Sequence, residues 1–322
     1  MRMIALLTLL TFLAGCGTPS FLITPVANTN QLKEEQVRRG RGLSPAKIAI
    51  IELDGMLINA RSGGFLQPTE NKLSLFIQQL EQAERDDAVK AVVLRINSPG
   101  GTVTASDIAY KAIVDFREST GKPVVASTQE MAASGGYYVA LGADRIVAHP
   151  TSVVGSIGVI FHTFNFEGTL HKIGARAEAI KSGDLKDMGS PFKALSPEER
   201  AVMQQMVDEY HARFVDVVKR HRTIADPATL AKATDGRVVS GEQAKQMGLV
   251  DATGTLEDAI DLAAELADVK NPSIILYRRP YGYGGSIYAS YPAPSEDGVL
   301  RLELPGTRSV LPTGFYYLWP AW

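Results

Sequence analysis

The chain has 322 residues and a net charge of −2 at pH 7, a length that fits one large domain or two small ones. Hydrophobic residues make up 45% of it and charged residues 21%, which are ordinary globular values and exclude a disordered chain, a collagen-like chain and a membrane protein with several spans. Lys and Arg are dispersed, so the charge predicts no nucleic-acid partner. The single cysteine, Cys16, excludes an intramolecular disulfide and a cysteine-based metal cluster.

The first 15 residues have the organisation of an export signal. Arg2 precedes an apolar run, Ile4 to Leu13, that is too short to span a bilayer, and small residues then lead to Cys16. Leu13-Ala14-Gly15-Cys16 resembles the bacterial lipobox, so we expect a lipoprotein signal peptide at 1–15, palmitate on Cys16 and a lipid anchor on a membrane. Gly17, which is not Asp, favours the outer membrane. The alternative is an unmodified signal peptide with an incidental cysteine.

Residues 16–45 are predicted to be a tether between this anchor and a folded body. They are polar, with Pro, Asn, Gln and charged side chains. The cluster Arg38-Arg39-Gly40-Arg41 lies within them and is interpreted as solvated linker. A short helix around Leu32–Val37 is the alternative.

From Lys47 onward, short apolar strands alternate with helices. Strands are predicted at Ile48–Leu53, Ala91–Ile96, Pro123–Ser127, Arg145–Ala148 and Val153–Val154. Helices are predicted at Thr69–Arg85, with Thr69 as N-cap, at Ala105–Glu118 and at Ser134–Leu141. This alternation indicates a parallel α/β core, in which functional residues gather at the carboxyl ends of the strands.

The second half of the body is predicted to be mainly helical. Ser196-Pro197-Glu198-Glu199 is typical of a helix N-terminus, and this helix is expected to reach about Arg220. Shorter helices at Ala225–Lys232, Gly241–Met247 and Leu256–Leu266 precede a last strand, Ser273–Tyr277. Residues 279–322 are rich in Gly, Tyr and Pro and are predicted to be an irregular tail. Its aromatic end is expected to dock on the body, on a partner or at a membrane interface.

The sequence contains no motif that indicates a metal site or a cofactor site. None of the histidines has metal-ligand spacing; they are His149, His162, His171, His211 and His221. Neither a Walker loop nor a dinucleotide-binding glycine pattern is present in the sequence. We therefore expect a protein without a metal or a cofactor.

Two glycine-containing turns remain as candidates for chemistry. Ser134 stands among small residues between a strand and a helix, where its hydroxyl can meet a substrate; the alternative is a helix N-cap followed by close-packed glycines. Gly100 and Gly101 follow another strand and leave bare backbone N–H groups, as an oxyanion site requires; the alternative is an ordinary tight turn.

A serine nucleophile requires a base. His149 is near in sequence, but no Asp partner for it is evident. The other candidate is a lysine that burial makes neutral. Lys186 follows a strand-like run, Arg176–Ile180, but the chemistry alone does not select it over Lys181 or Lys193, and a surface lysine paired with a neighbouring aspartate is the alternative.

In this order, the fragments resemble the signal peptide peptidase A family, the S49 serine peptidases, in its short single-domain form. The similarity runs over the domain 46–278 and rests on a set of motifs: Ile48–Gly55, Val92–Gly101, Ala126–Asp144, Gly155–Ile160, Ala179–Phe192 and Asp235–Asp251. The resemblance implies an α/β fold of the ClpP/crotonase-like type, a spiral of short parallel-sheet ββα units with a helical C-terminal part.

The resemblance also implies roles for residues. Ser134 would be the nucleophile and Lys186 the general base, with Ser156 orienting the lysine. Gly101 and Gly135 would supply the oxyanion N–H groups. Short members form homo-oligomers whose active sites lie between subunits, so Lys186 and Ser134 are expected to meet within or between chains.

The expected function is a membrane-anchored serine endopeptidase of the cell envelope, extracytoplasmic, that cleaves signal peptides or other apolar peptides. Two features differ from many members: Thr102 stands where a third glycine is common, and the expected anchor is a lipid instead of a transmembrane segment. A non-catalytic envelope scaffold with the same fold is the alternative. A crotonase-like acyl-CoA enzyme is a further one, which the export signal disfavours.

Overall fold

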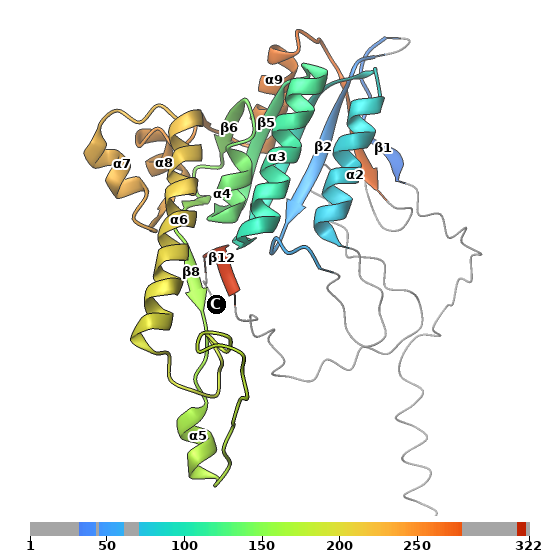
Figure 1. Ribbon diagram of the computed structural model, residues 1–322. Coiled ribbons are helices and arrows are strands. Elements are labelled where there is room, and N and C mark those ends of the chain that lie inside the picture. The colour runs from blue at the N-terminus through green and yellow to red at the C-terminus, as the bar shows by residue number, and fades with distance from the viewer. Residues whose placement is uncertain (1–31, 43–44, 61–70, 279–313, 320–322) are drawn as a thin grey trace, which may run out of the picture. The chain divides into compact units, whose positions relative to one another are not determined.

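The computed structural model describes residues 32–42, 45–60, 71–278 and 314–319 (Figure 1). The expected signal peptide, Cys16, Gly17 and Thr69 lie outside these residues, as does most of the expected tail. Among the helices of the described residues, none is both long enough and apolar enough to cross a bilayer.

The body is built on a mostly parallel sheet. Its strands lie in the order β1-β11-β2-β3-β5-β6-β10, and the neighbours from β11 to β10 are parallel while β1 is antiparallel to β11. The strands are β1 (Lys33–Arg38), β11 (Ser273–Arg278), β2 (Lys47–Asp54), β3 (Val89–Ser98), β5 (Val124–Ala133), β6 (Arg145–Ala148) and β10 (Ala252–Thr253). The predicted parallel α/β core is confirmed.

Alternating residues of the central strands pack on opposite faces of this sheet. Ala49 and Ile51 of β2 belong to the core under α2 (Lys72–Arg85), α3 (Val103–Thr120) and α4 (Gly135–Ala140). Ile48 and Ile50 face the other way, against α9 (Leu256–Leu266). Both faces are thus covered by helices, as Figure 1 shows for α2 and α3 on the near side, and this explains why the strands read as continuous apolar runs.

Helices α6 (Pro197–His221), α7 (Pro227–Ala233) and α8 (Gly241–Gln246) begin within two residues of their predicted starts, whereas α5 (Glu167–Lys172) was not predicted. Ser196 caps α6 through a capping box with Glu199, as the sequence indicates. The short helices α5, α7 and α8 complete the set in the described residues. The prediction that Thr69 caps α2 is wrong: Asn71 is the N-cap, since its side chain accepts from the Leu73 and Ser74 N–H groups.

Two strands lie where the sequence predicts irregular chain. β1 falls inside the expected tether and pairs with β11, and β12 (Gly314–Leu318) falls inside the expected tail. Both predictions of irregular structure are therefore wrong for these residues, because each segment forms hydrogen bonds with a strand far away in the sequence. The strand-like run Arg176–Ile180 is not a strand, since no neighbouring strand pairs with it in the described part of the chain.

β12 forms a second, small sheet beside the main one. It lies between β4 (Gly100–Thr102) and β8 (Ile160–His162) and is antiparallel to both. Figure 1 shows β12, in red, next to β8. The remaining strands, β7 (Val153–Gly155) and β9 (Val238–Ser240), extend the main sheet from the end of β5. These short strands surround the carboxyl ends of β3 and β5, where the candidate site lies.

Candidate active site

Ser134 occupies the junction of β5 and α4 in a strained conformation. Its φ of +52° is rare for a residue with a side chain, and such strain costs about 1–3 kcal/mol. The conformation is held from outside, because the Ser134 N–H donates to the Gly155 carbonyl at 2.7 Å. The residue is 1% exposed, yet its Oγ has no hydrogen-bond partner. A serine used only as an N-cap would satisfy its oxygen, so that interpretation does not describe this side chain.

The turn after β3 lies directly against this junction. Gly100 has a φ of +101°, and a β-carbon on it would lie 2.7 Å from the Gly135 nitrogen. A β-carbon on Gly101 would overlap the Leu57 carbonyl, whose oxygen accepts from the Thr102 N–H at 2.9 Å. Only glycine fits at these positions. The structure therefore brings the two predicted oxyanion residues, Gly101 and Gly135, into neighbouring backbone segments.

Buried hydroxyl groups that no sequence motif marks brace the same turn. Ser98 donates to the Gly55 carbonyl at 2.6 Å and accepts from the Gly100 N–H at 3.1 Å. The Ser106 hydroxyl donates to the Thr102 carbonyl at 3.0 Å and lies so close to Gly135 that a β-carbon there would overlap it. In the sequence, Ser98 ends a strand and Ser106 lies in the first turn of α3, and these positions could have indicated that both residues lie near the site.

Ser156 lies one residue beyond the carbonyl that holds Ser134. It has a φ of +51° and is 7% exposed, and its N–H donates to the Arg237 carbonyl at 2.7 Å. A pocket of about 390 Å³ opens beside Ser156, and its lining includes Asp208 and Asp235. Both carboxylates are already engaged, Asp235 by Arg237 and Asp208 by Gln204, so Ser156 contributes a further polar group to this lining.

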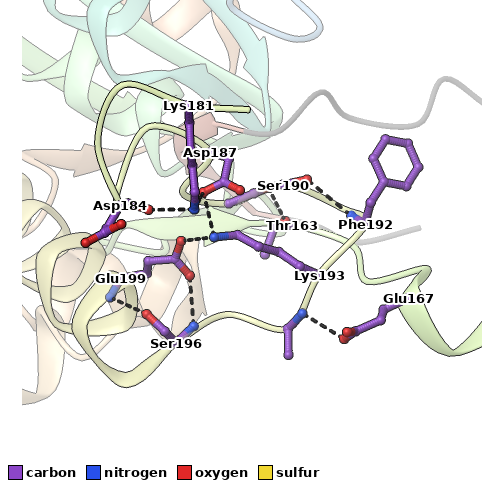
Figure 2. Close-up of polar contacts among 12 residues, drawn as sticks. Thr163, Glu167, Lys181, Asp184, Asp187, Ser190, Phe192, Lys193, Ser196 and Glu199 are labelled. Atoms are coloured by element: carbon purple, nitrogen blue, oxygen red, sulfur yellow. Dashed lines mark hydrogen bonds and ion pairs between the residues drawn. The ribbon is translucent and has the colours of Figure 1, made fainter. Parts of the chain in front are cut away.

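Lys186 belongs to the segment between α5 and α6, which carries three lysines in a dense polar network. Lys181 and Lys193 both donate to Asp187 at 2.7 Å, and Lys193 also donates to the buried carboxylate of Glu199 (Figure 2). Hydrogen bonds from Lys181 and then Lys193 lower the pKa of Asp187 from 3.8 to about 2. Hydrogen bonds to Asp187 and then Glu199 in turn raise the pKa of Lys193.

Lys186 itself is exposed, and within the described residues its amine has neither an ion pair nor a hydrogen bond. The alternative of a surface lysine paired with a neighbouring aspartate therefore does not hold in this chain, because Asp187 is engaged by the two other lysines. The same chain does not bring Lys186 to Ser134, whose Oγ is without a partner.

His149, the other candidate base, does not meet Ser134 either. It is exposed, and its Nδ1 lies 2.8 Å from the Thr151 hydroxyl. Within the described residues no group of three His, Cys, Asp or Glu side chains is arranged to hold a metal ion.

Comparisons with known proteins agree with this arrangement. Residues 50–154 match the model of the Clp protease family, and residues 117–270 match that of peptidase family S49. A protein of Enterococcus faecium that carries the name signal peptide peptidase SppA is 34% identical over 250 residues, which are 78% of this chain and 72% of that protein. A protein of Methanocaldococcus jannaschii named as a protease is 43% identical over 202 residues, and Protease 4 of Salmonella typhi is 41% identical over 202 residues.

The mostly parallel sheet with a serine at a strained strand-to-helix junction thus defines an α/β protein of the Clp protease type. Within that class, the chain belongs to peptidase family S49, the signal peptide peptidase A family. The matched region covers 64% of the M. jannaschii protein and 32% of Protease 4, so the chain is considerably shorter than the latter.

Proposed function

We propose that this protein is a membrane-anchored serine endopeptidase in which Ser134 is the nucleophile and Lys186 of a neighbouring copy is the general base. One observation supports the nucleophile above all. The Ser134 Oγ is buried without a hydrogen-bond partner, on a residue held at positive φ beside two obligatory glycines. A group kept in so costly a state points to a reactive role.

The network in Figure 2 supports the choice of base. Lys181 and Lys193 are paired with Asp187 and Glu199, and these bonds raise the pKa of Lys193 (Figure 2). Lys186 lies exposed in the same segment, and its amine has no partner among the described residues. An amine accepts a proton only when it is uncharged, and desolvation favours the uncharged form. Docking of Lys186 against a second copy would supply that desolvation.

The pocket beside Ser156 supports an arrangement between subunits. It is open to the outside of the single chain, lies one residue from the carbonyl that holds Ser134, and carries a hydroxyl that can orient an incoming amine. A homo-oligomer in which each copy offers Lys186 to the pocket of the next would complete every site.

The mechanism follows from these positions. Neutral Lys186 takes the proton of Ser134, and the alkoxide attacks the carbonyl carbon of a peptide bond. The N–H groups of Gly101 and Gly135 receive the negative oxygen, and each such donor is worth about 3–4 kcal/mol of barrier. The protonated lysine then gives its proton to the leaving amine, and water hydrolyses the acyl-enzyme.

The cellular setting is the second half of the proposal. A lipid on Cys16 would hold the domain at a membrane, on the extracytoplasmic side and with Gly17 favouring the outer membrane, where signal peptides and other apolar peptides are the accessible substrates. Labelling of the full chain with a palmitate analogue, compared with Cys16→Ser, tests the anchor. Label on the wild type alone supports it, and equal label on both contradicts it.

The catalytic half is tested by three variants assayed on an apolar peptide. Ser134→Ala and Lys186→Ala are each expected to lower kcat by about 10⁴-fold or more, because a nucleophile and its base act as a unit. Lys172→Ala, which removes an exposed lysine of α5 from the same lobe, is expected to retain wild-type activity. Wild-type cleavage by both site variants would contradict the dyad. A wild-type chain that neither cleaves nor reacts with a serine-directed phosphonate would favour a scaffold.

A further inference from the structure

Two backbone hydrogen bonds connect the loop after α7 to the proposed nucleophile. The Ser156 N–H donates to the Arg237 carbonyl at 2.7 Å, and the carbonyl of the preceding residue, Gly155, accepts from the Ser134 N–H at 2.7 Å. A β-carbon on Gly155 would lie 3.0 Å from the Arg237 carbonyl oxygen, so the two segments are in close contact. A shift of the Arg237 carbonyl would therefore move Ser156 together with the segment that holds Ser134.

Both serines depend on their surroundings because both are strained. Ser134 has a φ of +52° and Ser156 a φ of +51°, and such conformations persist only where the neighbouring structure imposes them. Part of that structure is the antiparallel pairing of β7 with β9, in which Gly155 lies opposite Val238, the residue after Arg237. The position of Arg237 is thus coupled to the geometry of the proposed site.

A salt bridge within the loop fixes Arg237. The Asp235 carboxylate accepts from the Arg237 backbone N–H at 3.1 Å and from its Nε and Nη2 atoms at 2.8 and 2.5 Å. These bonds lower the pKa of Asp235 and raise that of Arg237. Gly236, between them, has a φ of +89°, which lets the chain turn tightly enough for the two side chains to meet. Both side chains are exposed, so the pair adds little to stability by itself, and its main effect is to fix the direction of the Arg237 peptide group.

His211 of α6 fixes the other end of the loop. Its Nε2 lies 2.9 Å from the Thr234 carbonyl oxygen, and because a carbonyl only accepts, this nitrogen carries the proton. Both residues line the pocket of about 390 Å³ beside Ser156. The loop is therefore held at both ends, and it forms one wall of the pocket that is proposed to receive the base.

We propose that Arg237 is a positioning residue of the peptidase reaction: its salt bridge with Asp235 fixes the carbonyl group that holds Ser156. The place at which the amine of Lys186 meets Ser134 is set in this way, so the inference rests on the proposed function. Arg237 acts through the backbone of Ser156 and makes no contact with the peptide bond to be cut. Its removal should therefore slow the chemical step and leave peptide binding unchanged.

The test measures kcat and KM for an apolar peptide with the full-length protein that carries Arg237→Ala, Asp235→Ala or both changes. Each single variant is expected to lower kcat by about 10- to 100-fold with KM within about twofold of the wild type, since a misplacement of about 1 Å has effects of this size. The double variant is expected to be no slower than the slower single variant, because both changes remove the same salt bridge. Losses that multiply in the double variant would overturn a shared role.

Asp235→Asn separates geometry from charge. Asparagine keeps an oxygen that can accept from the Arg237 N–H groups, so kcat is expected to stay within about threefold of the wild type. An Asp235→Asn enzyme as slow as Asp235→Ala would overturn the positioning role. Arg85→Ala is the matched control, because it breaks an exposed salt bridge with Glu81 on α2 and should cleave at the wild-type rate.

The outcomes separate this inference from the proposed function. If Arg237→Ala cleaves as fast as Arg85→Ala while Ser134→Ala and Lys186→Ala are inactive, the positioning role is overturned and the proposed function stands. A wild-type chain that does not cleave overturns both. If circular dichroism shows Arg237→Ala to be unfolded, Arg237→Lys decides: it keeps the charge but not the two-pronged bond, and is expected to lower kcat by about fivefold with KM unchanged. A wild-type kcat in that variant would overturn the inference.

Discussion

The segments that carry Ser134 and Lys186 are built in opposite ways. Ser134 lies at the end of a buried strand, and its backbone is fixed by Gly155 and by the glycine turn of the next strand. Lys186 lies in an exposed segment without a strand, which is braced by carboxylates alone. One chain therefore preorganises the proposed nucleophile and oxyanion residues, whereas the proposed base is exposed. A second copy would have to complete the site.

Within this comparison, the largest loss of activity is expected from a change in the glycine turn beside Ser134. In Gly101→Ala the new β-carbon would overlap the Leu57 carbonyl and displace β4, so we expect kcat/KM to fall by about 10²-fold or more. Strain of this kind costs about 1–3 kcal/mol in the free energy of unfolding. Peptide cleavage and urea unfolding measure the two effects.

Gly121→Ala is the control for that change. Gly121 ends α3 with a φ of +65° and has open space around it, so alanine there costs about 1–2 kcal/mol of stability through backbone strain alone. Its activity should stay at the wild-type level. An active Gly101→Ala enzyme would show that the backbone beside Ser134 is not as constrained as the structure indicates.

A smaller effect is expected in the exposed segment that carries Lys186. Asp187→Asn removes the charge that holds both Lys181 and Lys193, so the segment that presents Lys186 loses its brace. We expect kcat to fall by about 10-fold, since a misplacement of about 1 Å is enough for such a loss, together with a small loss of stability. Asp115→Asn, which breaks an exposed pair with Lys111 on α3, is the control and should cleave normally. A fully active Asp187→Asn enzyme would show that the ion pairs of Asp187 are not needed for catalysis.

The smallest effect concerns pH. The pKa of Asp187 is lowered from 3.8 to about 2, so its bonds contribute stability above pH 4 and lose that contribution as the pH falls toward 2. Hydrogen bonds from Lys193 and Ser196 lower the pKa of Glu199 in the same direction. Wild type should therefore exceed Asp187→Asn in urea stability at pH 6, with a difference that shrinks below pH 4. A difference that is constant from pH 6 to pH 3 would contradict the ion-paired network.

The core and the meeting of the two glycine-containing turns at Ser134 could be predicted from the sequence because their signals are local. Apolar β-branched runs mark β2, β3 and β5, and glycines at the ends of two of these strands mark the turns that meet at Ser134. The carboxyl ends of parallel strands lie at one edge of the sheet, so the turns that follow β3 and β5 are expected to be neighbours.

The strands β1 and β12 could not be predicted because their signals are not local. β1, with the sequence Lys-Glu-Glu-Gln-Val-Arg, is a strand only because β11 pairs with it from the far end of the chain. β12 carries aromatic residues typical of strands, but its glycine- and proline-rich surroundings outweighed that signal. Arg176–Ile180 shows the reverse, an alternating run that pairs with no strand in the described residues.

The most direct test of the two-copy site is complementation between inactive chains. Ser134→Ala retains Lys186, and Lys186→Ala retains Ser134, so neither chain alone can cleave. Co-assembled in equal amounts, they are expected to recover about a quarter of the wild-type rate, because half of the pockets hold the serine and half of those receive the lysine. A mixture that assembles but stays as inactive as its components would contradict a site shared between copies.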